Sequence, residues 1–294
     1  MKRVFTLIIA VLVTVVLSAQ NFTRSYPVSS FTGINAGGVF DITLVKGSSN
    51  TVTITSDKEI SQYVEVKVKS GVLYLNLDTD KMPNSIKRRM KYIEANISIK
   101  QLEKIYLSGA ARLSSSGLFN PATFKGDFSG AVVAKGLNIN SQTATFYASG
   151  ASRIDIKGKF QSVKYDISGA SKVTIDQDAT DVTLGGSGAS VMDYSGKSTI
   201  VDVSISGATH VSMKGSATTA NFEASGASVL NAEDFIVKDV DIEVSGVSQV
   251  RANVTGSISA EISGGSVVNY SGSPVVKKIE TSSQGSFKRI GSSN

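Results

Sequence analysis

The side chains that could perform nucleophilic, acid–base or metal chemistry are few in this sequence. Its 294 residues include no cysteine, no tryptophan and one histidine, His210. Without cysteine the chain has no disulfide, no thiol nucleophile and no cysteine-based zinc site, and one histidine cannot build a multi-histidine metal centre. A Ser-His-Asp triad would have to use His210 alone. This residue precedes Val211 in an alternating segment, so we expect its side chain to face solvent.

Acidic side chains recur at comparable places in the second half of the chain. They are Asp202, Glu223, Asp241, Glu243 and Glu261. All five occupy positions that alternation directs to solvent, so we expect a loose acidic stripe. Stacked like charges destabilise one another unless they are solvated or bound to cations. A solvated face, a weak calcium or partner surface and a catalytic acid pair therefore stay open, and we assign no catalytic, cofactor-binding or metal-binding residue.

Basic side chains gather in one short segment of the first half. Residues 81–91 contain Pro83 and the cluster Lys87, Arg88 and Arg89. We expect a protruding loop here, because the segment is polar, carries a proline and lies between two alternating stretches. It is either a solvated basic loop or a contact for an acidic polymer or a phospholipid surface.

Aromatic residues are scarce, which bears on carbohydrate binding. They make up 7% of the chain, whereas sugar-binding grooves usually rely on aromatic platforms. Tyr194 and Tyr270 fall at inward positions of the repeat described below, so we expect both in the core. The sequence therefore offers no evident sugar platform.

These side chains are positioned by an internal repeat. The tripeptide Ser-Gly-Ala, with two close variants, recurs nine times, at intervals of 21, 20, 19, 19, 19, 19, 20 and 18 residues. Its glycines are Gly109, Gly130, Gly150, Gly169, Gly188, Gly207, Gly226, Gly246 and Gly264. A sustained period of about 19 residues indicates a solenoid rather than a propeller, whose blades need about 40 residues.

Each repeat reads as two alternating segments and two turns. In residues 149–167 the corner Ser-Gly-Ala-Ser precedes residues 153–156, a second turn is expected at residues 157–159, and residues 163–167 lead to the next corner. Period two with β-branched residues predicts strands. We therefore predict an all-β, right-handed parallel β-helix with coils of about 19 residues stacked about 4.8 Å apart. Glycine would permit positive φ, alanine would fit a tight corner, and the serines would form a hydroxyl ladder.

The chain before the repeat differs in texture. Residues 28–107 also alternate, with a turn at residues 69–71, but they contain no Ser-Gly-Ala. They are either irregular coils of the same rod or a β-cap, which a solenoid needs because a bare terminal coil exposes unpaired strand edges. At the other end, residues 282–294 are polar, with Phe287 and Ile290 placed to close the last coil.

The N-terminus has the pattern of an export signal. Lys2 and Arg3 precede an apolar run from Val4 to Leu17, and Ala19 ends a small-residue cleavage site. The run is shorter than the roughly 20 residues that a membrane span needs. We expect a signal peptide at residues 1–19, no transmembrane segment in the mature chain, and export to the periplasm, outer-membrane surface or extracellular space. The mature chain keeps 28 basic and 24 acidic side chains, an excess too small to indicate nucleic-acid binding.

The order of these features resembles a known family. A signal peptide, then Gly33-Ile34-Asn35, then residues 40–44 before a glycine turn, then serial Ser-Gly-Ala corners are similar to the putative auto-transporter adhesin, head GIN domain family. The resemblance covers roughly residues 28–275. It implies an exported β-helical protein with an adhesion role, of a kind common in Bacteroidetes, and it supplies no catalytic residue.

From these observations we expect four parts. They are a signal peptide (1–19), an N-terminal β-rich part of the head GIN domain (20–107), the Ser-Gly-Ala β-helix (108–281) and a C-terminal tail (282–294). The expected function is that of a non-enzymatic adhesin or envelope scaffold making multivalent contacts with a surface ligand, protein or glycan, or with an envelope protein, and using no cofactor. The alternatives are a carbohydrate-binding or polysaccharide-degrading β-helix and a periplasmic protein that docks onto a partner.

Overall fold

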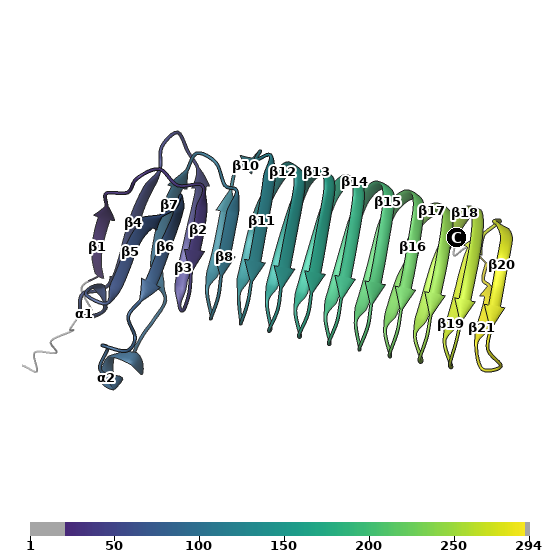
Figure 1. Ribbon diagram of the computed structural model, residues 1–294. Helices are drawn as coiled ribbons and strands as arrows, with labels where there is room; N and C mark the ends of the chain where they lie inside the picture. Colours follow the sequence, from purple (N-terminus) through teal and green to yellow (C-terminus); the bar gives the residue numbers. More distant parts are fainter. Residues whose placement is uncertain (1–20, 292–294) are drawn as a thin grey trace, which may run out of the picture.

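The chain folds into a long β-solenoid, seen here in a computed structural model that describes residues 21–291 (Figure 1). Strands make up 68% of the structure, and about ten coils of about 19 residues follow one another. In Figure 1 the strands of the near sheet run downward while successive coils advance to the right, so the path is right-handed. The predicted right-handed parallel β-helix is confirmed. The expected signal peptide at residues 1–19 lies outside the described residues.

The elements before the regular coils are short. They are β1 (Asn21–Tyr26), β2 (Gly33–Ala36), β3 (Phe40–Lys46), β4 (Thr51–Asp57), α1 (Lys58–Ser61), β5 (Val64–Lys69), β6 (Val72–Leu77), α2 (Asn84–Lys87), β7 (Ile93–Ile99), β8 (Lys104–Leu107), β9 (Arg112–Ser116), β10 (Leu118–Phe119) and β11 (Thr123–Phe128). The coils then follow as β12 (Val133–Ala148), β13 (Arg153–Ile167), β14 (Lys172–Gly186), β15 (Val191–Ile205), β16 (His210–Ala224), β17 (Val229–Val244), β18 (Gln249–Ile262), β19 (Val267–Gly272), β20 (Val275–Thr281) and β21 (Ser286–Arg289).

The strands form two faces of a flattened rod. The first sheet begins with β1, β4, β7, β3 and β9, continues through the first halves of β12 to β18, and ends at β19 and β21. The second sheet begins with β5, β6, β2, β8 and β11, continues through the second halves of the same long strands, and ends at β20. Each long strand therefore serves both faces.

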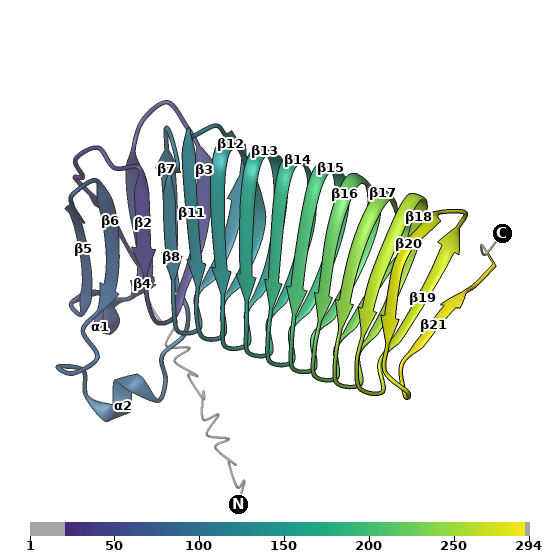
Figure 2. The same cartoon turned by 45° about the vertical axis from the view of Figure 1, so that its right-hand side comes forward.

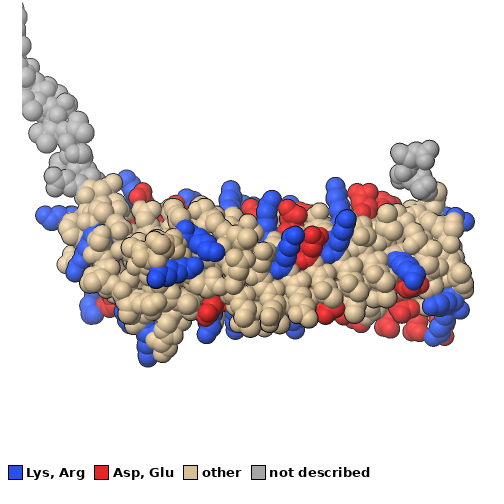
Figure 3. Space-filling model, turned by 90° about the horizontal axis from the view of Figure 1, so that it is seen from above, with Lys and Arg blue, Asp and Glu red and all other residues tan. Residues whose placement is uncertain are grey.

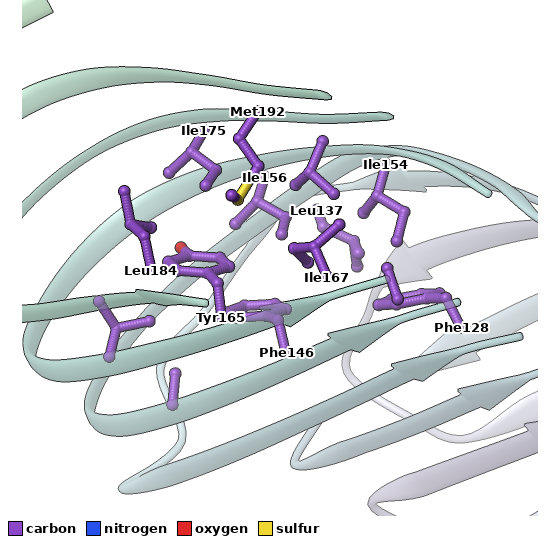
Figure 4. Packing of buried hydrophobic residues seen from close by; sticks show 14 of the residues in the cluster. Phe128, Leu137, Phe146, Ile154, Ile156, Tyr165, Ile167, Ile175, Leu184 and Met192 are labelled. Carbon is purple, nitrogen blue, oxygen red and sulfur yellow. The ribbon is translucent and has the colours of Figure 1, made fainter. Parts of the chain in front are cut away.

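Inward side chains stack in columns because neighbouring coils pair residue for residue. Ile154, Val173, Met192, Val211 and Leu230 form one such column and are all buried. Figure 4 shows the packing inside the rod, where the rings of Phe146 and Tyr165 lie parallel with centroids 5.1 Å apart. Burial of apolar surface in these columns supplies the main driving force for folding.

The Ser-Gly-Ala corner needs glycine for two reasons. All nine glycines have φ between 66° and 89°, a region that disfavours residues with a Cβ. They also stack closely: the Ala208 amide donates to the Gly188 carbonyl at 2.7 Å, and a Cβ on Gly207 would lie 2.6 Å from that oxygen. The predicted positive φ is confirmed, and the stacking adds a second constraint.

The alanine of the corner has a different role from the one expected. Its side chain is exposed at Ala151, Ala170 and Ala189, and Val247 occupies the same place at 68% exposure. The prediction that alanine fits a crowded corner is therefore wrong. The close contact is at the glycine, and the alanine after it contributes only a backbone N–H that donates to the preceding coil.

The following serine or threonine is buried in seven successive coils. Thr209 donates to the carbonyl of Ser206 at 2.8 Å, within its own corner. Hydroxyls of neighbouring coils also meet, Ser190 with Thr209 at 3.3 Å and Ser228 with Ser248 at 3.4 Å. The expected hydroxyl ladder is thus partly formed, and a local bond within the corner accompanies it at four of these residues, Ser152, Thr209, Ser228 and Ser248.

The second turn expected in each coil is absent from β13. Gly158 lies inside the continuous strand Arg153–Ile167 and pairs with Gln177 of the next coil. The chain therefore changes from one sheet to the other by bending within a strand. Parallel pairing continues through the bend, since neighbouring coils bend at the same place.

The N-terminal region combines the two alternatives predicted for it. Strands β2 and β3 pair in parallel with their neighbours, so residues 33–46 form a coil of the rod. Strand β4 is antiparallel to β1 and β7, and β5 is antiparallel to β6. These antiparallel strands cap the first coil, as Figure 2 shows. The predicted turn at residues 69–71 joins β5 to β6, with positive φ at Ser70 and Gly71.

At the other end the polar segment continues the rod. Strand β21 pairs with β19, and the Phe287 ring stacks on Tyr270 with centroids 4.7 Å apart. Val276 lies in register with the buried Ile258 but is 45% exposed, because no described coil follows it. Within residues 21–291, no helix has the length and apolar character required to cross a membrane.

Candidate functional site

The acidic residues predicted from the sequence lie on the outer face of the second sheet, in two columns rather than one stripe. Asp202 and Asp241 share a column with Asn221 between them. Glu223, Glu243 and Glu261 form the adjacent column, in direct register from coil to coil. All five are exposed, as expected.

A fourth glutamate, missed in the sequence, extends the second column. Glu280 of β20 pairs with Glu261 of β18. A local signal was available, because each member of the column stands two residues before a corner serine. The four local sequences are Glu-Ala-Ser, Glu-Val-Ser, Glu-Ile-Ser and Glu-Thr-Ser. We call Glu223, Glu243, Glu261 and Glu280 the glutamate column.

A shallow groove of about 540 Å³ runs beside the glutamate column. Its lining includes the four glutamates and the corner serines Ser206, Ser225, Ser245, Ser263 and Ser282. Some of these serine hydroxyls bond to the backbone of the preceding coil, as that of Ser282 does to the Gly264 carbonyl at 3.1 Å. The carboxylates are therefore the main charged groups of the groove.

One cation beside this column, Lys278, is in register with Ser259 and contacts two of the glutamates. Lys278 donates to Glu261 at 2.7 Å, and its nitrogen lies 2.9 Å from a Glu280 oxygen. The bond to Glu261 contributes most, and the bond to Glu280 next, to raising the pKa of the Lys278 ammonium. Glu223 accepts a bond from Asn221 at 3.2 Å. Within residues 21–291, Glu223 and Glu243 lie in no ion pair.

Several charged side chains on the first sheet form ion pairs between neighbouring coils. Lys157 pairs with Asp176 of the next coil at 3.2 Å, and Lys172 pairs with Asp193 at 3.0 Å. Arg251 lies 3.7 Å from Glu233 in the same way. Figure 3 shows basic and acidic side chains interleaved over much of the rod, with acidic side chains gathered along one edge toward the C-terminal end. Among the described residues, cross-coil ion pairs are thus more frequent on the first sheet than beside the glutamate column.

The glutamates at the C-terminal end of the column are open to solvent. Side chains of Glu261 and Glu280 are 52% and 63% exposed, whereas a general acid is usually a carboxyl shielded from water. Among the described residues, no group of three or more histidine, cysteine, aspartate or glutamate side chains is arranged to hold a metal ion. The arrangement is suited to contacting a partner through charge and hydrogen bonds.

His210 is placed as predicted. Its side chain is exposed at the start of β16, and its Nε2 lies 3.2 Å from the Ser212 hydroxyl. Tyr194 is buried, as predicted, and bonds to the Ser198 hydroxyl at 2.7 Å. Tyr270 is half-buried against the core. None of these residues lies in the groove.

The basic segment at residues 81–91 is a protrusion that apolar side chains fix to the core. It contains α2, and the side chains of Lys87, Arg88 and Arg89 lie near this short helix. Arg89 lies 3.3 Å from Glu59 of α1. Met82 is buried with 3% exposure, which a freely extended loop would not show. The predicted protrusion is present, and an apolar anchor secures its base.

Solved structures share the fold of this chain. A protein described as a putative adhesin from Parabacteroides distasonis ATCC 8503 is 15% identical, with 92% of this chain and 98% of that chain covered and a TM-score of 0.54. A putative adhesin from Parabacteroides merdae ATCC 43184 is 17% identical, with 92% and 96% covered and a TM-score of 0.50. A putative lipid binding protein from Parabacteroides distasonis ATCC 8503 is 13% identical, with 92% and 96% covered and a TM-score of 0.48.

The sequence itself matches a family along most of its length. None of the curated proteins matches it. The family model described as "Putative auto-transporter adhesin, head GIN domain" matches residues 30–190 and again residues 171–274. The two overlapping matches together span the first coils, the Ser-Gly-Ala corners and three members of the glutamate column. The chain belongs to this head GIN domain family.

Proposed function

We propose that the protein is a non-enzymatic adhesion module, displayed on the cell envelope, that binds a surface partner through the outer face of its second sheet. The observation that carries the proposal is the contrast between the two sheets. Cross-coil ion pairs neutralise several carboxylates on the first sheet, while Glu223 and Glu243 on the second form no ion pair with any described residue.

Repetition gives this face its mechanism. Neighbouring coils place equivalent side chains about 4.8 Å apart, so one partner meets several similar contacts in a row. Individually weak surface contacts then combine into useful avidity. The stacked core keeps the contacts in fixed positions, which limits the entropy lost on binding.

Location is the first test of this function. Intact cells carrying the protein are labelled with an antibody against the rod, alongside protease treatment and a lysed-cell control. We expect labelling from outside. Labelling only after the envelope is opened would contradict surface display and favour a periplasmic partner.

Attachment is the second test. A strain lacking the gene is compared with the complemented strain on mucin-coated plates and in autoaggregation. We expect attachment or aggregation to fall in the strain that lacks the gene and to return on complementation. Equal behaviour of the two strains in both assays would contradict the adhesion role.

A further inference from the structure

The N-terminal half of the second sheet carries a regular row of tyrosines. Along the outer face, residues in register across β6, β2, β8, β11, β12 and β13 are Tyr74, Asn35, Tyr106, Asp127, Tyr147 and Asp166. Strands β6, β2, β8 and β11 lie side by side in Figure 2. Tyrosine therefore alternates with an amide or a carboxylate, and we call this column the tyrosine strip.

The spacing of the tyrosines is set by the backbone. Neighbouring strands of a sheet lie about 4.8 Å apart, so tyrosines on every second strand are about 10 Å apart. The side chains of Tyr74, Tyr106 and Tyr147 are each half-buried at the sheet surface. The three come from distant parts of the sequence, and the stacking of strands brings them into one row.

Lysines line one side of the tyrosine strip. Lys104, Lys125 and Lys164 occupy the neighbouring outward column, with Thr145 between the last two. The Lys125 ammonium lies 5.8 Å from the ring centre of Tyr106 and 5.4 Å from that of Tyr147. All three lysines are exposed, and none forms an ion pair with a described residue.

The same two columns change charge along the rod. In the lysine column the outward residues after Lys164 are Thr183 and Asp202. In the tyrosine column the glutamates begin at Glu223. An anionic partner is therefore attracted beside the lysines and repelled farther along, which confines it to the N-terminal half of the sheet.

We propose that the tyrosine strip binds a linear polysaccharide that carries uronate groups. Tyrosine rings offer apolar faces for the C–H faces of pyranose rings. Asn35, Asp127 and Asp166 accept hydrogen bonds from sugar hydroxyls, and the lysines pair with uronate carboxylates. A period of two strands suits an extended chain, because it is comparable to the length of two linked pyranose rings.

The strip favours a polysaccharide over other anionic polymers. The carboxylates of Asp127 and Asp166 stand within the strip and would repel a polymer as densely charged as nucleic acid. A uronate polymer carries at most one charge per sugar together with several hydroxyl groups, so it can use these carboxylates as acceptors. The inference goes beyond the proposed adhesion function, because it concerns other residues than the glutamate column and names a ligand class.

Affinity electrophoresis tests the inference, with the purified protein run through gels that contain polygalacturonate. We expect retardation of the wild type. Tyr106→Ala and Tyr147→Ala should each weaken binding about tenfold, the effect of losing one apolar ring contact. Tyr106→Phe should bind as the wild type does, and Tyr92→Ala is the matched control, since Tyr92 is an exposed tyrosine outside the strip.

Charge gives a second and independent arm. The double variant Lys104→Glu, Lys164→Glu changes exposed side chains only, so it keeps the test decisive if a tyrosine variant fails to fold. It should also weaken binding at least tenfold, and salt at about 1 M should weaken wild-type binding. Neutral cellohexaose is the comparison ligand and should bind more weakly.

Three results would overturn the inference. They are no retardation of the wild type, unchanged binding of correctly folded tyrosine variants and the lysine variant, or equal, salt-independent binding of cellohexaose. Loss of cell attachment in the strain that lacks the gene can occur with any of these results. Failure of polysaccharide binding is therefore distinguishable from failure of the adhesion role.

Discussion

At the scale of single residues, the corner glycines carry the strictest requirement in the molecule. Gly207 has φ of 72°, and a Cβ there would meet the Gly188 carbonyl. Gly265 also stands in a corner, at the place where other coils have alanine, and a Cβ there would make an ordinary contact of 3.7 Å with Val247. The two positions differ in backbone conformation and in space.

The first prediction compares these two glycines. Gly207→Ala should lower the free energy of unfolding by at least about 2 kcal/mol, because it places a Cβ in the left-handed region and against a stacked carbonyl. Gly265→Ala should change it by less than about 0.5 kcal/mol. Urea unfolding measures both, and equal destabilisation would show that stacking does not restrict the corner.

The buried tyrosines make stability depend on pH. Burial raises the pKa of Tyr165 well above its ordinary value of about 10. The Tyr165 hydroxyl donates to Gln177 at 2.5 Å inside the rod. Burial also raises the pKa of Tyr194, and the bonds from Ser198 and Gln177 oppose that shift.

The second prediction follows from the sign of this shift. Above pH of about 10 the unfolded chain releases the Tyr165 proton while the folded chain retains it, so stability present below that pH is lost as the pH rises. The urea midpoint should therefore fall between about pH 9 and pH 11, and it should fall less in Tyr165→Phe. An equal fall of the urea midpoint with pH in the wild type and in Tyr165→Phe would show that Tyr165 does not cause the pH dependence. This comparison is independent of any stability lost at neutral pH with the Gln177 bond.

At the scale of elements, the basic protrusion illustrates how one buried residue fixes a segment. Its charges suggest a free loop, but Met82 is buried in the core and Ile86 and Met90 pack against it. The short α2 is therefore held at its base. Arg88 directly follows this helix, is exposed and serves as a neighbour without an anchor role.

The third prediction tests this anchor. Met82→Ala should cost about 2–5 kcal/mol, the range for deleting a buried methionine side chain. Arg88→Ala should change stability by less than about 0.5 kcal/mol. Hydrogen exchange of residues 79–92 should increase in the methionine variant, and unchanged exchange would mean that the segment is not held by Met82.

The sequence predicts elements well where they repeat and poorly where they do not. Alternation and the constant position of glycines such as Gly150 and Gly169 were enough to predict the coil, because every coil packs its inward side chains in the same way. The bend at Gly158 was predicted as a turn, since glycine between lysines looks like a break. The antiparallel pairing of β4 with β1 and β7, and of β5 with β6, could not be predicted. Strand direction depends on distant partners that alternation does not specify.

At the scale of the whole molecule, stability is expected to be a sum of coils and of their contacts with neighbours. Coil 187–205 begins at a corner serine and ends where the next coil begins its own corner. Its neighbours present matching inward residues, since Ile175 and Met213 both pair with Tyr194. One coil is therefore removable in principle without changing the register of the rest.

The fourth prediction is that deletion of residues 187–205 leaves a folded rod shortened by about 4.8 Å. Small-angle scattering measures the length, and circular dichroism checks that strand content is kept. Deletion of residues 187–196 is the control, because removing only the corner and the first half of a coil joins two segments of the same sheet and should prevent folding. A full-coil deletion that unfolds the protein would contradict stability additive over coils.

The binding face was only partly predictable. Exposure of Asp202 and Glu223 follows from alternation, so the acidic surface was foreseen. Its division into two columns follows from the distance to the next corner serine, which is four residues for Asp202 and Asp241 and two residues for the glutamates. The tyrosine strip was not foreseen. Tyr74 and Tyr147 are far apart in the sequence and join one row only because of the order in which the strands stack.

Attachment of variants that alter one sheet at a time tests whether adhesion uses the second sheet. Glu223→Gln, Glu243→Gln and Glu261→Gln together remove charge from the second sheet and keep side-chain size. Asp155→Asn, Asp176→Asn and Asp193→Asn do the same on the first sheet. We predict that attachment falls severalfold in the glutamate variant and stays at the wild-type level in the aspartate variant. Equal attachment of both, with each correctly folded and displayed, would contradict a binding role for the glutamate column.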